Sequence, residues 1–367
     1  MRKQQCPQQS LEKGTWFKLI CGASFQDLPA VRNLTLAYTL AGADCIDVAA
    51  DPAVVDAARE GLNVARSLQC EASSRGYPEM RSPWLMASVN DAEDPHFRKA
   101  QFDPNRCPPE CSRPCEPICP ANAIDANGVI DRRCYGCGRC LPVCPFGILE
   151  TRSYVSTPES IAALVLSQGV DALEIHTQPG QLEAFQRLWR AVRPWVDRLK
   201  IVAVSCPDRP NTLDYLRSID RLMAPLPYPP IWQTDGRPMS GDIGKGTTKA
   251  AIEFGRKVLE SDLPGYVQLA GGTNHYTVPK LKSLNLFNNS LNLVGSSAKQ
   301  FPKVSSTAKY IAGVAYGSYA RTLLSPILEQ LENQKRESAM RLENHSDLLW
   351  SAVELARSLV AQHTPNC

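Results

Sequence analysis

Long hydrophobic runs are absent from this sequence of 367 residues. Its longest apolar stretches, such as 161–166 and 199–204, fall far short of the roughly 20 residues that a membrane-spanning helix needs. No apolar stretch follows the basic start Met-Arg-Lys, so we expect neither a secretory signal nor a transmembrane segment. The sequence therefore predicts a cytoplasmic protein.

The sequence also lacks an excess of charge of either sign. The net charge is only +3, and the sequence has neither a block of Lys and Arg nor a stripe of alternating basic and aromatic residues. Such features mark nucleic-acid-binding surfaces, so we expect no nucleic-acid partner. With 43% hydrophobic and 21% charged residues, the composition is typical of a globular protein with a sizeable core.

Cysteine, by contrast, is abundant and unevenly distributed. The chain has 14 cysteines, and eight of them lie between Cys107 and Cys144. In a chain expected to be cytoplasmic, such crowding indicates metal ligation and argues against disulfide bonds.

Strand and helix patterns alternate on both sides of the cysteines. A helical stretch, a glycine, an aspartate and a buried strand follow one another at 28–50, and Gly169 and Asp171 repeat the end of this unit before the strand around Ile175. Such repetition is typical of a parallel β/α sheet. The expected strands are Trp16–Gly22, Cys45–Ala50, Pro83–Val89, the segment around Ile175, Lys200–Ser205, Pro230–Thr234, Tyr266–Ala270 and Tyr310–Tyr316.

Eight β/α units predict a closed (β/α)8 barrel-like domain, and an open doubly wound α/β sheet is the alternative. We expect the barrel-like domain to comprise residues 12–93 and 156–330. A ferredoxin-like 4Fe-4S domain is expected at 94–152 and a C-terminal helical tail at 331–367. Because the insertion follows the third strand, the clusters should lie at the face of the barrel formed by the loops after the strands.

The second half of the cysteine cassette matches a bacterial ferredoxin motif. Cys134-x2-Cys137-x2-Cys140-x3-Cys144-Pro145 has the full spacing, in which three thiolates wrap one cubane and the fourth binds the other. Gly136 and Gly138 suit a loop whose backbone approaches the sulfurs. A zinc site would favour two separated cysteine pairs.

The first half repeats this pattern in a stretched form. Cys107, Cys111, Cys115 and Cys119 follow one another at spacings of x3, and Pro120 follows the last of them. By the repeat, one [4Fe-4S] cluster is held by Cys107, Cys111, Cys115 and Cys144, and a second by Cys134, Cys137, Cys140 and Cys119. A single cluster with spare cysteines is the alternative.

Other candidate sites lie at strand ends. Gly271, Gly272 and Gly317 follow the last two strands, where flavin-binding barrels often hold a phosphate, so they predict an FMN or phosphate site or, alternatively, tight turns. His176 and His275 occupy positions suited to an acid or base, or to a simple loop hydrogen bond. Asp47 and Glu174 are expected to face inward, into a polar barrel interior or a ligand site.

The remaining isolated cysteines show no ligand spacing. We expect them to be core or terminal residues: Cys6, Cys21, Cys45, Cys70, Cys206 and Cys367.

Three segments together resemble a known family. The cassette from Cys107 to Pro145, the segment Ala270-Gly-Gly-Thr-Asn-His-Tyr-Thr277 and the segment Ala315-Tyr-Gly-Ser-Tyr-Ala-Arg321 are similar to those of LdpA, the light-dependent period proteins of cyanobacteria, over about residues 12–330. The resemblance implies a non-catalytic iron–sulfur redox sensor of the circadian clock. It implies as partners a clock-input histidine kinase, the Kai oscillator proteins and an electron donor from the photosynthetic chain.

Two other function classes stay open on the residues alone. In an oxidoreductase, the clusters would pass electrons to a flavin or substrate at the barrel mouth. A plain electron-carrier module would exchange electrons with a donor without forming a regulatory complex.

Overall fold

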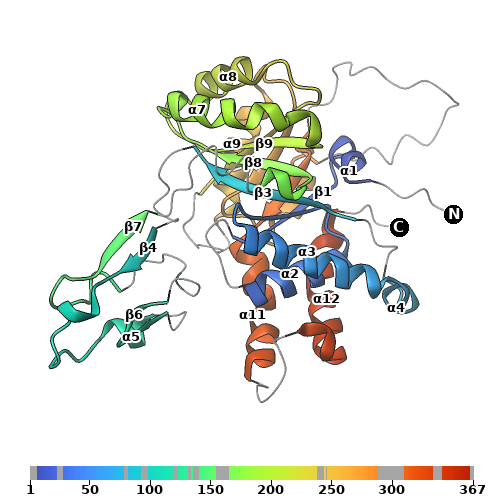
Figure 1. Cartoon of the computed structure of the whole chain (residues 1–367). Coiled ribbons are helices and arrows are strands. Elements are labelled where there is room, and N and C mark those ends of the chain that lie inside the picture. Colours follow the sequence, from blue (N-terminus) through green and yellow to red (C-terminus); the bar gives the residue numbers. More distant parts are fainter. Residues whose placement is uncertain are drawn as a thin grey trace, which may run out of the picture.

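The computed structural model describes residues 6–22, 28–77, 82–91, 98–119, 123–130, 134, 140–153, 165–237, 244, 246–287, 310–333 and 341–363. Eight parallel strands close into a barrel, which confirms the predicted fold class and rules out the open sheet (Figure 1). The strands are, in chain order, β1 (Trp16–Ile20), β2 (Cys45–Ala49), β3 (Trp84–Asn90), β8 (Ala172–His176), β9 (Ile201–Pro207), β10 (Ile231–Asp235), β11 (Tyr266–Ala270) and β12 (Gly313–Tyr316).

Helices surround the barrel. They are α1 (Pro7–Lys13), α2 (Leu28–Ala41), α3 (Pro52–Ser67), α4 (Gln69–Ser74), α7 (Leu182–Val192), α8 (Thr212–Met223), α9 (Thr248–Leu259), α10 (Thr277–Ser283), α11 (Ser318–Asn333) and α12 (Ser346–Val360). Short 3-10 turns add η3 (Leu166–Gln168), η4 (Arg193–Arg198), η6 (Leu342–Asn344) and η7 (Ala361–His363).

The glycines that precede β2 and β8 end their helical segments as predicted. Gly42 and Gly169 have φ angles of 99° and 78°, in the left-handed region that glycine enters without steric penalty. α7 ends at Val192, although the amphipathic pattern of the sequence extends over residues 181–199, and the chain continues as the 3-10 turn η4. Pro194 lies at the start of that turn and has no N–H to donate to a continuing α-helix.

The barrel has two apolar cores, one outside the ring of strands and one inside it. The larger core lies between the strands and the surrounding helices. A smaller cluster fills the N-terminal end of the barrel interior, where Leu11 of α1 packs with Trp16, Trp84, Met86 and Ile231. α1 therefore closes the end opposite to the mouth, which is the rim formed by the C-terminal ends of the strands.

Part of the expected C-terminal tail packs into the barrel structure. α12 lies against α2 and α11, and its Leu349, Val353 and Leu359 are buried in the main core. Arg32 of α2 pairs with Glu343 of η6, which fixes the segment before α12. α12 is thus one of the packed outer helices of the barrel.

The inserted region consists of small, separate elements between β3 and β8. β4 (Arg98–Gln101) pairs antiparallel with β7 (Glu150–Ser153), and β5 (Ile124–Asp125) pairs with β6 (Gly128–Val129). Two short helical turns, η2 (Pro104–Arg106) and α5 (Cys115–Ile118), connect them. In Figure 1 these elements stand to one side of the barrel.

Candidate metal centre and barrel interior

The four cysteines predicted for the first cluster surround one pocket. The pocket is lined by the thiols of Cys107, Cys111, Cys115 and Cys144 together with Phe102, Pro114, Pro145, Phe146, Ile148 and Leu149. The turn of α5 places Cys115 at the pocket, and the turns before β7 place Cys144 there. An apolar lining limits water around such a centre and thereby influences its potential.

Backbone N–H groups point at two of these sulfurs. Burial raises the pKa of the Cys144 thiol, but hydrogen bonds from the backbone N–H groups of residues 146–149 outweigh burial and lower it. The N–H of Arg113 donates to Cys111 Sγ at 3.4 Å, and Arg113 has a left-handed φ of 50°. The loop after Cys144 therefore stabilises its thiolate, whereas loss of solvation raises the pKa of the Cys107 and Cys115 thiols.

The remaining cysteines lie in the small core of the same region. Cys134 and Cys140 are buried there, and Cys119 packs against them. The N–H of Ala123 donates to Cys119 Sγ at 3.2 Å, and that of Ala100 to Cys134 Sγ at 3.4 Å. Cys137, the fourth predicted ligand, lies outside the described residues.

This donor set fits an iron–sulfur centre. Thiols that surround a pocket, backbone N–H groups at the sulfurs and an apolar lining are what such a centre requires. Among the described residues, no three His, Cys, Asp or Glu side chains converge closely enough to hold a single metal ion. A cubane holds its four thiolates farther apart than one ion does.

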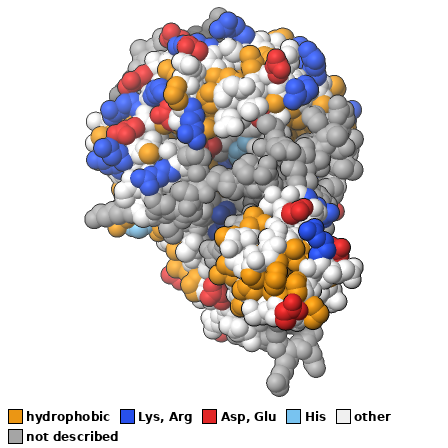
Figure 2. Space-filling model, turned by 90° about the vertical axis from the view of Figure 1, so that its left-hand side faces the viewer, with side chains coloured by type: hydrophobic (Ala, Val, Ile, Leu, Met, Phe, Trp, Pro, Cys, Tyr) orange, Lys and Arg blue, Asp and Glu red, His pale blue; other side chains and the backbone are white. Residues whose placement is uncertain are grey.

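Apolar side chains are exposed on this region. Phe146 at the rim of the pocket is 48% exposed and Ile118 is 40% exposed, among the most exposed large hydrophobic residues described. Figure 2 shows hydrophobic side chains gathered on the lower lobe, the part of the molecule where Figure 1 places the insertion. The charged residues spread more evenly over the upper lobe.

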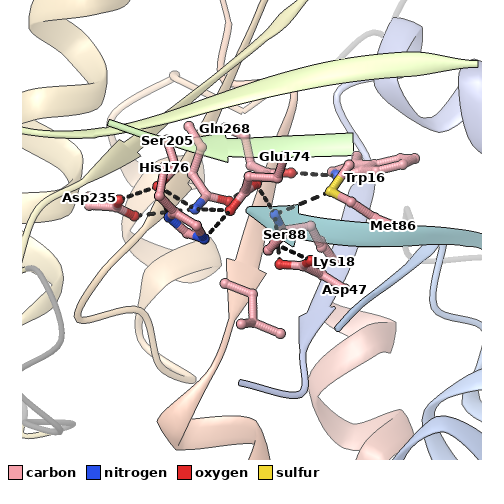
Figure 3. A network of polar contacts seen from close by, with 12 residues as sticks. Trp16, Lys18, Asp47, Met86, Ser88, Glu174, His176, Ser205, Asp235 and Gln268 are labelled. Atoms are coloured by element: carbon pink, nitrogen blue, oxygen red, sulfur yellow. Dashed lines mark hydrogen bonds and ion pairs between the residues drawn. The ribbon is translucent and has the colours of Figure 1, made fainter. Parts of the chain in front are cut away.

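A buried ion-pair network crosses the barrel interior. Lys18 of β1 is fully buried and pairs with Glu174 of β8 and, at 3.4 Å, with Asp47 of β2 (Figure 3). Ser88 of β3 donates to Asp47, and Gln233 of β10 donates to Glu174 at 3.0 Å. The inward positions predicted for Asp47 and Glu174 are confirmed, and they form a polar interior.

Burial shifts the titration of this network. It raises the pKa of Asp47 to about 6, although Lys18 opposes that shift. Burial by itself lowers the pKa of Lys18, but the carboxylates of Asp47 and Glu174 outweigh it and raise that pKa above its ordinary value. Lys18 is therefore charged in the folded barrel.

A second polar group lies toward the mouth. His176 Nδ1 is 2.9 Å from Ser205 Oγ, and Ser205 donates to Asp235 Oδ2 at 2.5 Å. Burial raises the pKa of Asp235 to about 6. Of these residues, only His176 was predicted from the sequence as a site residue. Ser205 and Asp235 could have been found from the alternation of inward and outward positions along β9 and β10, which places both on the inward face.

Close backbone contacts account for two of the predicted phosphate-site glycines. Gly271 and Gly272 have φ angles of +65° and +91°, and a Cβ at either would lie within 3.0 Å of the backbone of Arg237 or Thr247. The hydroxyl of Thr247 donates to the Gly272 carbonyl at 2.7 Å. Gly317 has only ordinary contacts. A phosphate or FMN site at these glycines stays a prediction.

The two later segments that carry the family resemblance meet in space. The hydroxyl of Tyr319 lies 2.7 Å from Nδ1 of His275, and the two rings are 5.4 Å apart. The Tyr276 ring also contacts this imidazole, with ring centroids 3.8 Å apart and an interplanar angle of 42°. His275 is thus a loop histidine with a local hydrogen bond.

Most of the isolated cysteines behave as expected. Cys21, Cys45 and Cys206 are buried in the core and Cys6 is exposed near the N-terminus. The expectation was wrong for Cys70, which is exposed on α4, a short helix whose one buried residue is Ala72. Cys367 lies outside the described residues.

The fold and the cysteine-lined centre define a class, a (β/α)8 barrel protein with an inserted iron–sulfur cluster-binding region. Residues 107–155 match the LdpA Fe-S cluster-binding domain, and residues 164–362 match the light dependent period A C-terminal domain. A protein from Synechococcus elongatus described as "Light dependent period A" is 48% identical over 354 residues, which cover 96% of this chain and 92% of that protein. The chain therefore belongs to the light dependent period A (LdpA) family.

One solved structure, from Aquifex aeolicus, matches 97% of this chain and 96% of that chain with 9% identity and a TM-score of 0.27, which carries no argument. Within the described residues, no helix has the length and apolarity needed to cross a membrane.

Proposed function

We propose that this protein is a cytoplasmic iron–sulfur redox sensor that reports the redox state of the cell, and hence light, to the circadian clock through protein–protein contacts. One observation carries the proposal: the thiols of Cys107, Cys111, Cys115 and Cys144 line a pocket whose rim includes the exposed Phe146. A centre in that place lies next to a surface that a partner protein can touch. The description of the Synechococcus relative as "Light dependent period A" supports the link to light.

The cofactor we propose is a pair of [4Fe-4S] clusters. Such a centre, when bound, supplies one-electron oxidation and reduction. Cys107, Cys111, Cys115 and Cys144 would hold one cluster, and Cys119, Cys134, Cys137 and Cys140 the other. The backbone N–H groups after Cys144 stabilise negative charge at that sulfur, and the aromatic and aliphatic lining limits water.

The first cluster site is the better candidate for the sensing element. Its sequence spacing is stretched, and Cys107 and Cys111 are partly exposed, whereas Cys134 and Cys140 are buried. A change of charge by one unit acts more directly on a partner when it occurs close to the contact surface. The apolar rim around Phe146 supplies that surface.

The partners we propose are a clock-input histidine kinase and the Kai oscillator proteins, with an electron donor from the photosynthetic chain. A signal passes only if a partner binds the oxidised and reduced forms with different affinity. A tenfold difference in affinity corresponds to about 1.4 kcal/mol, which a single altered charge at an interface can provide.

The experiment that tests the sensor measures binding of the purified kinase and Kai proteins to anaerobic protein, both oxidised and dithionite-reduced. Phe146→Ser should weaken binding at least tenfold in the tighter-binding state, because it removes an apolar contact at the rim. Leu182→Ser is the matched control, since Leu182 is 37% exposed on a barrel helix. Equal affinities in both redox states would refute the sensor.

The ligand assignment has its own test. Cys107→Ala should lower the iron and sulfide content from about eight of each per chain to about four, because one cubane loses a ligand while the other keeps its set. Cys70→Ala, which removes an exposed cysteine outside the cassette, should change nothing. An unchanged content in Cys107→Ala would contradict the assignment.

A second candidate is an oxidoreductase in which the clusters pass electrons to a flavin or substrate at the barrel mouth. The polar group formed by His176, Ser205 and Asp235 favours it, since acid–base residues of barrel enzymes lie at that end. An absorbance spectrum of anaerobically purified protein distinguishes the two. Flavin bands beside the broad iron–sulfur absorption support the enzyme.

A further inference from the structure

The imidazole of His176 lies between two acceptors at the barrel mouth. Its Nδ1 is 2.9 Å from the hydroxyl oxygen of Ser205, and its Nε2 is 3.4 Å from Oε1 of Glu174 (Figure 3). The side chain is 23% exposed, whereas its Nε2 atom is buried.

The hydrogen bonds around the ring determine where its protons must be. The one hydroxyl proton of Ser205 is donated to Asp235 Oδ2 at 2.5 Å, and Gln233 Nε2 donates to the Ser205 oxygen at 3.2 Å. Ser205 therefore offers His176 only a lone pair. Nδ1 therefore donates to Ser205. The Glu174 carboxylate lies at ion-pair distance from Nε2, 3.4 Å, so its negative charge favours a proton on that nitrogen as well.

The surrounding charges favour the same state. Among the described residues around the ring, several strands contribute polar groups, and one of these groups is a fixed cation. The charged groups are Lys18 on β1, Asp47 on β2, Glu174 on β8 and Asp235 on β10, with Asp91 after β3, and the uncharged ones are Ser88, Ser205, Gln233 and Gln268. A second cation therefore brings the buried network closer to neutrality.

We propose that His176 is held as an imidazolium in the folded protein and that this makes the mouth of the barrel a pH-sensitive element. The main chain of His176 joins this element to the inserted region. Its carbonyl accepts the N–H of Asp91 at 3.1 Å, and the hydroxyl of the next residue, Thr177, donates to the Asp91 carboxylate. Asp91 follows β3, at the point where the chain leaves the barrel.

Loss of the proton changes the contacts of the ring. Without it, one ring nitrogen presents a lone pair to the oxygen of Ser205 or of Glu174. That nitrogen and the oxygen it faces are then both acceptors, and they repel each other. The ring then moves, and the segment that holds Asp91 moves with it. This inference is independent of the proposed clock function, because it involves no cluster and no partner.

The test is an NMR titration of the ring nitrogens in the full-length, anaerobically purified protein labelled on histidine. The chain has five histidines, so His176→Gln assigns the signal. We expect the midpoint of His176 at least one pH unit above the ordinary value of about 6.5, which is a tenfold tighter hold on the proton. A midpoint at or below 6.5 overturns the proposal.

A milder variant keeps the test valid if His176→Gln does not fold. Ser205→Ala removes the acceptor of Nδ1 and should lower the midpoint of His176. His275→Gln, a change at an exposed loop, should leave it unchanged. Burial raises the pKa of the Asp91 carboxyl to about 7, so the amide signal of Asp91 also reports its own carboxyl. A component of that signal that shifts with the His176 midpoint in Ser205→Ala supports the link to the inserted region, and an Asp91 titration that Ser205→Ala leaves unchanged refutes it.

Discussion

Replacing Lys18 by methionine removes the cation that compensates two buried carboxylates. Lys18, Asp47 and Glu174 are all at most 2% exposed, and Lys18 bonds directly to Glu174. Removing one partner of a buried ion pair leaves an uncompensated charge, which costs about 3–5 kcal/mol. We therefore expect Lys18→Met to lower the free energy of unfolding by about 3–5 kcal/mol at pH 8. Methionine has a similar length, so lost packing contributes little.

The loss should depend on pH. Asp47 has a folded-state pKa of about 6, above its ordinary value of 3.8, because burial outweighs the attraction of Lys18. Removal of Lys18 raises this pKa further. A folded protein that binds a proton more readily than the unfolded chain gains stability as the pH falls through the folded-state pKa. The deficit of Lys18→Met should therefore shrink between pH 8 and pH 5.5.

The assay is urea denaturation followed by tryptophan fluorescence and circular dichroism at both pH values. Lys200→Met is the matched control, because Lys200 pairs with Asp171 at 2.6 Å but is 52% exposed, and an exposed pair contributes at most about 1 kcal/mol. Lys18→Met combined with Glu174→Gln should recover part of the stability. Equal losses in Lys18→Met and Lys200→Met, or a Lys18→Met deficit that does not shrink in acid, would refute the reasoning.

Two further predictions concern backbone packing and the C-terminal segment. Gly313→Ala should destabilise the barrel by about 1–3 kcal/mol, because the added Cβ would lie 2.3 Å from the Trp16 carbonyl oxygen. The measurement is thermal unfolding, with Gly169→Ala as the comparison. At Gly169 no atom lies within 4 Å of the added Cβ, so that variant reports left-handed backbone strain without a clash. Arg32→Met should destabilise the attachment of the C-terminal segment, and hydrogen exchange in α12 would report it. Burial raises the pKa of Glu343, but the hydrogen bond to Arg32 outweighs burial and lowers it below its ordinary value of 4.5. The stability from this pair is therefore present above pH 4.5 and lost as the pH falls through the folded-state pKa of Glu343. A loss of stability in Arg32→Met that does not depend on pH would contradict this.

The barrel could be predicted from sequence because its signals are local and repeated. The units that end in Gly42 and Gly169 each join a helical segment to a buried strand, and this repetition specifies parallel strands one after another. The ends of elements were harder to predict. Pro194 changes the form of a helix that the apolar periodicity would continue, and α12 is buried by contacts with α2 that are distant in sequence.

The centre and the interior differ in what the sequence reveals. Cysteine spacing predicts candidate ligands directly, because a cubane would set the distances between thiolates along one short segment. Lys18 was missed because it lies within the apolar run Trp16–Ile20 and a lysine in a strand is usually solvent-exposed. Its partners come from β2 and β8, and only closure of the ring brings those strands around it.

The order of strands around the ring has a consequence for how this family is divided. The segment that matches the C-terminal domain, residues 164–362, contains β8 to β12, which are five of the eight strands. The gap between β12 and β8 is filled by β1, β2 and β3 from the other side of the iron–sulfur insertion. A fragment limited to 164–362 would have two unpaired sheet edges and an uncompensated Glu174, so it should aggregate where the whole chain folds. The two halves are complementary pieces of one ring, and coexpressing residues 1–91 with residues 164–367 should restore solubility by strand complementation.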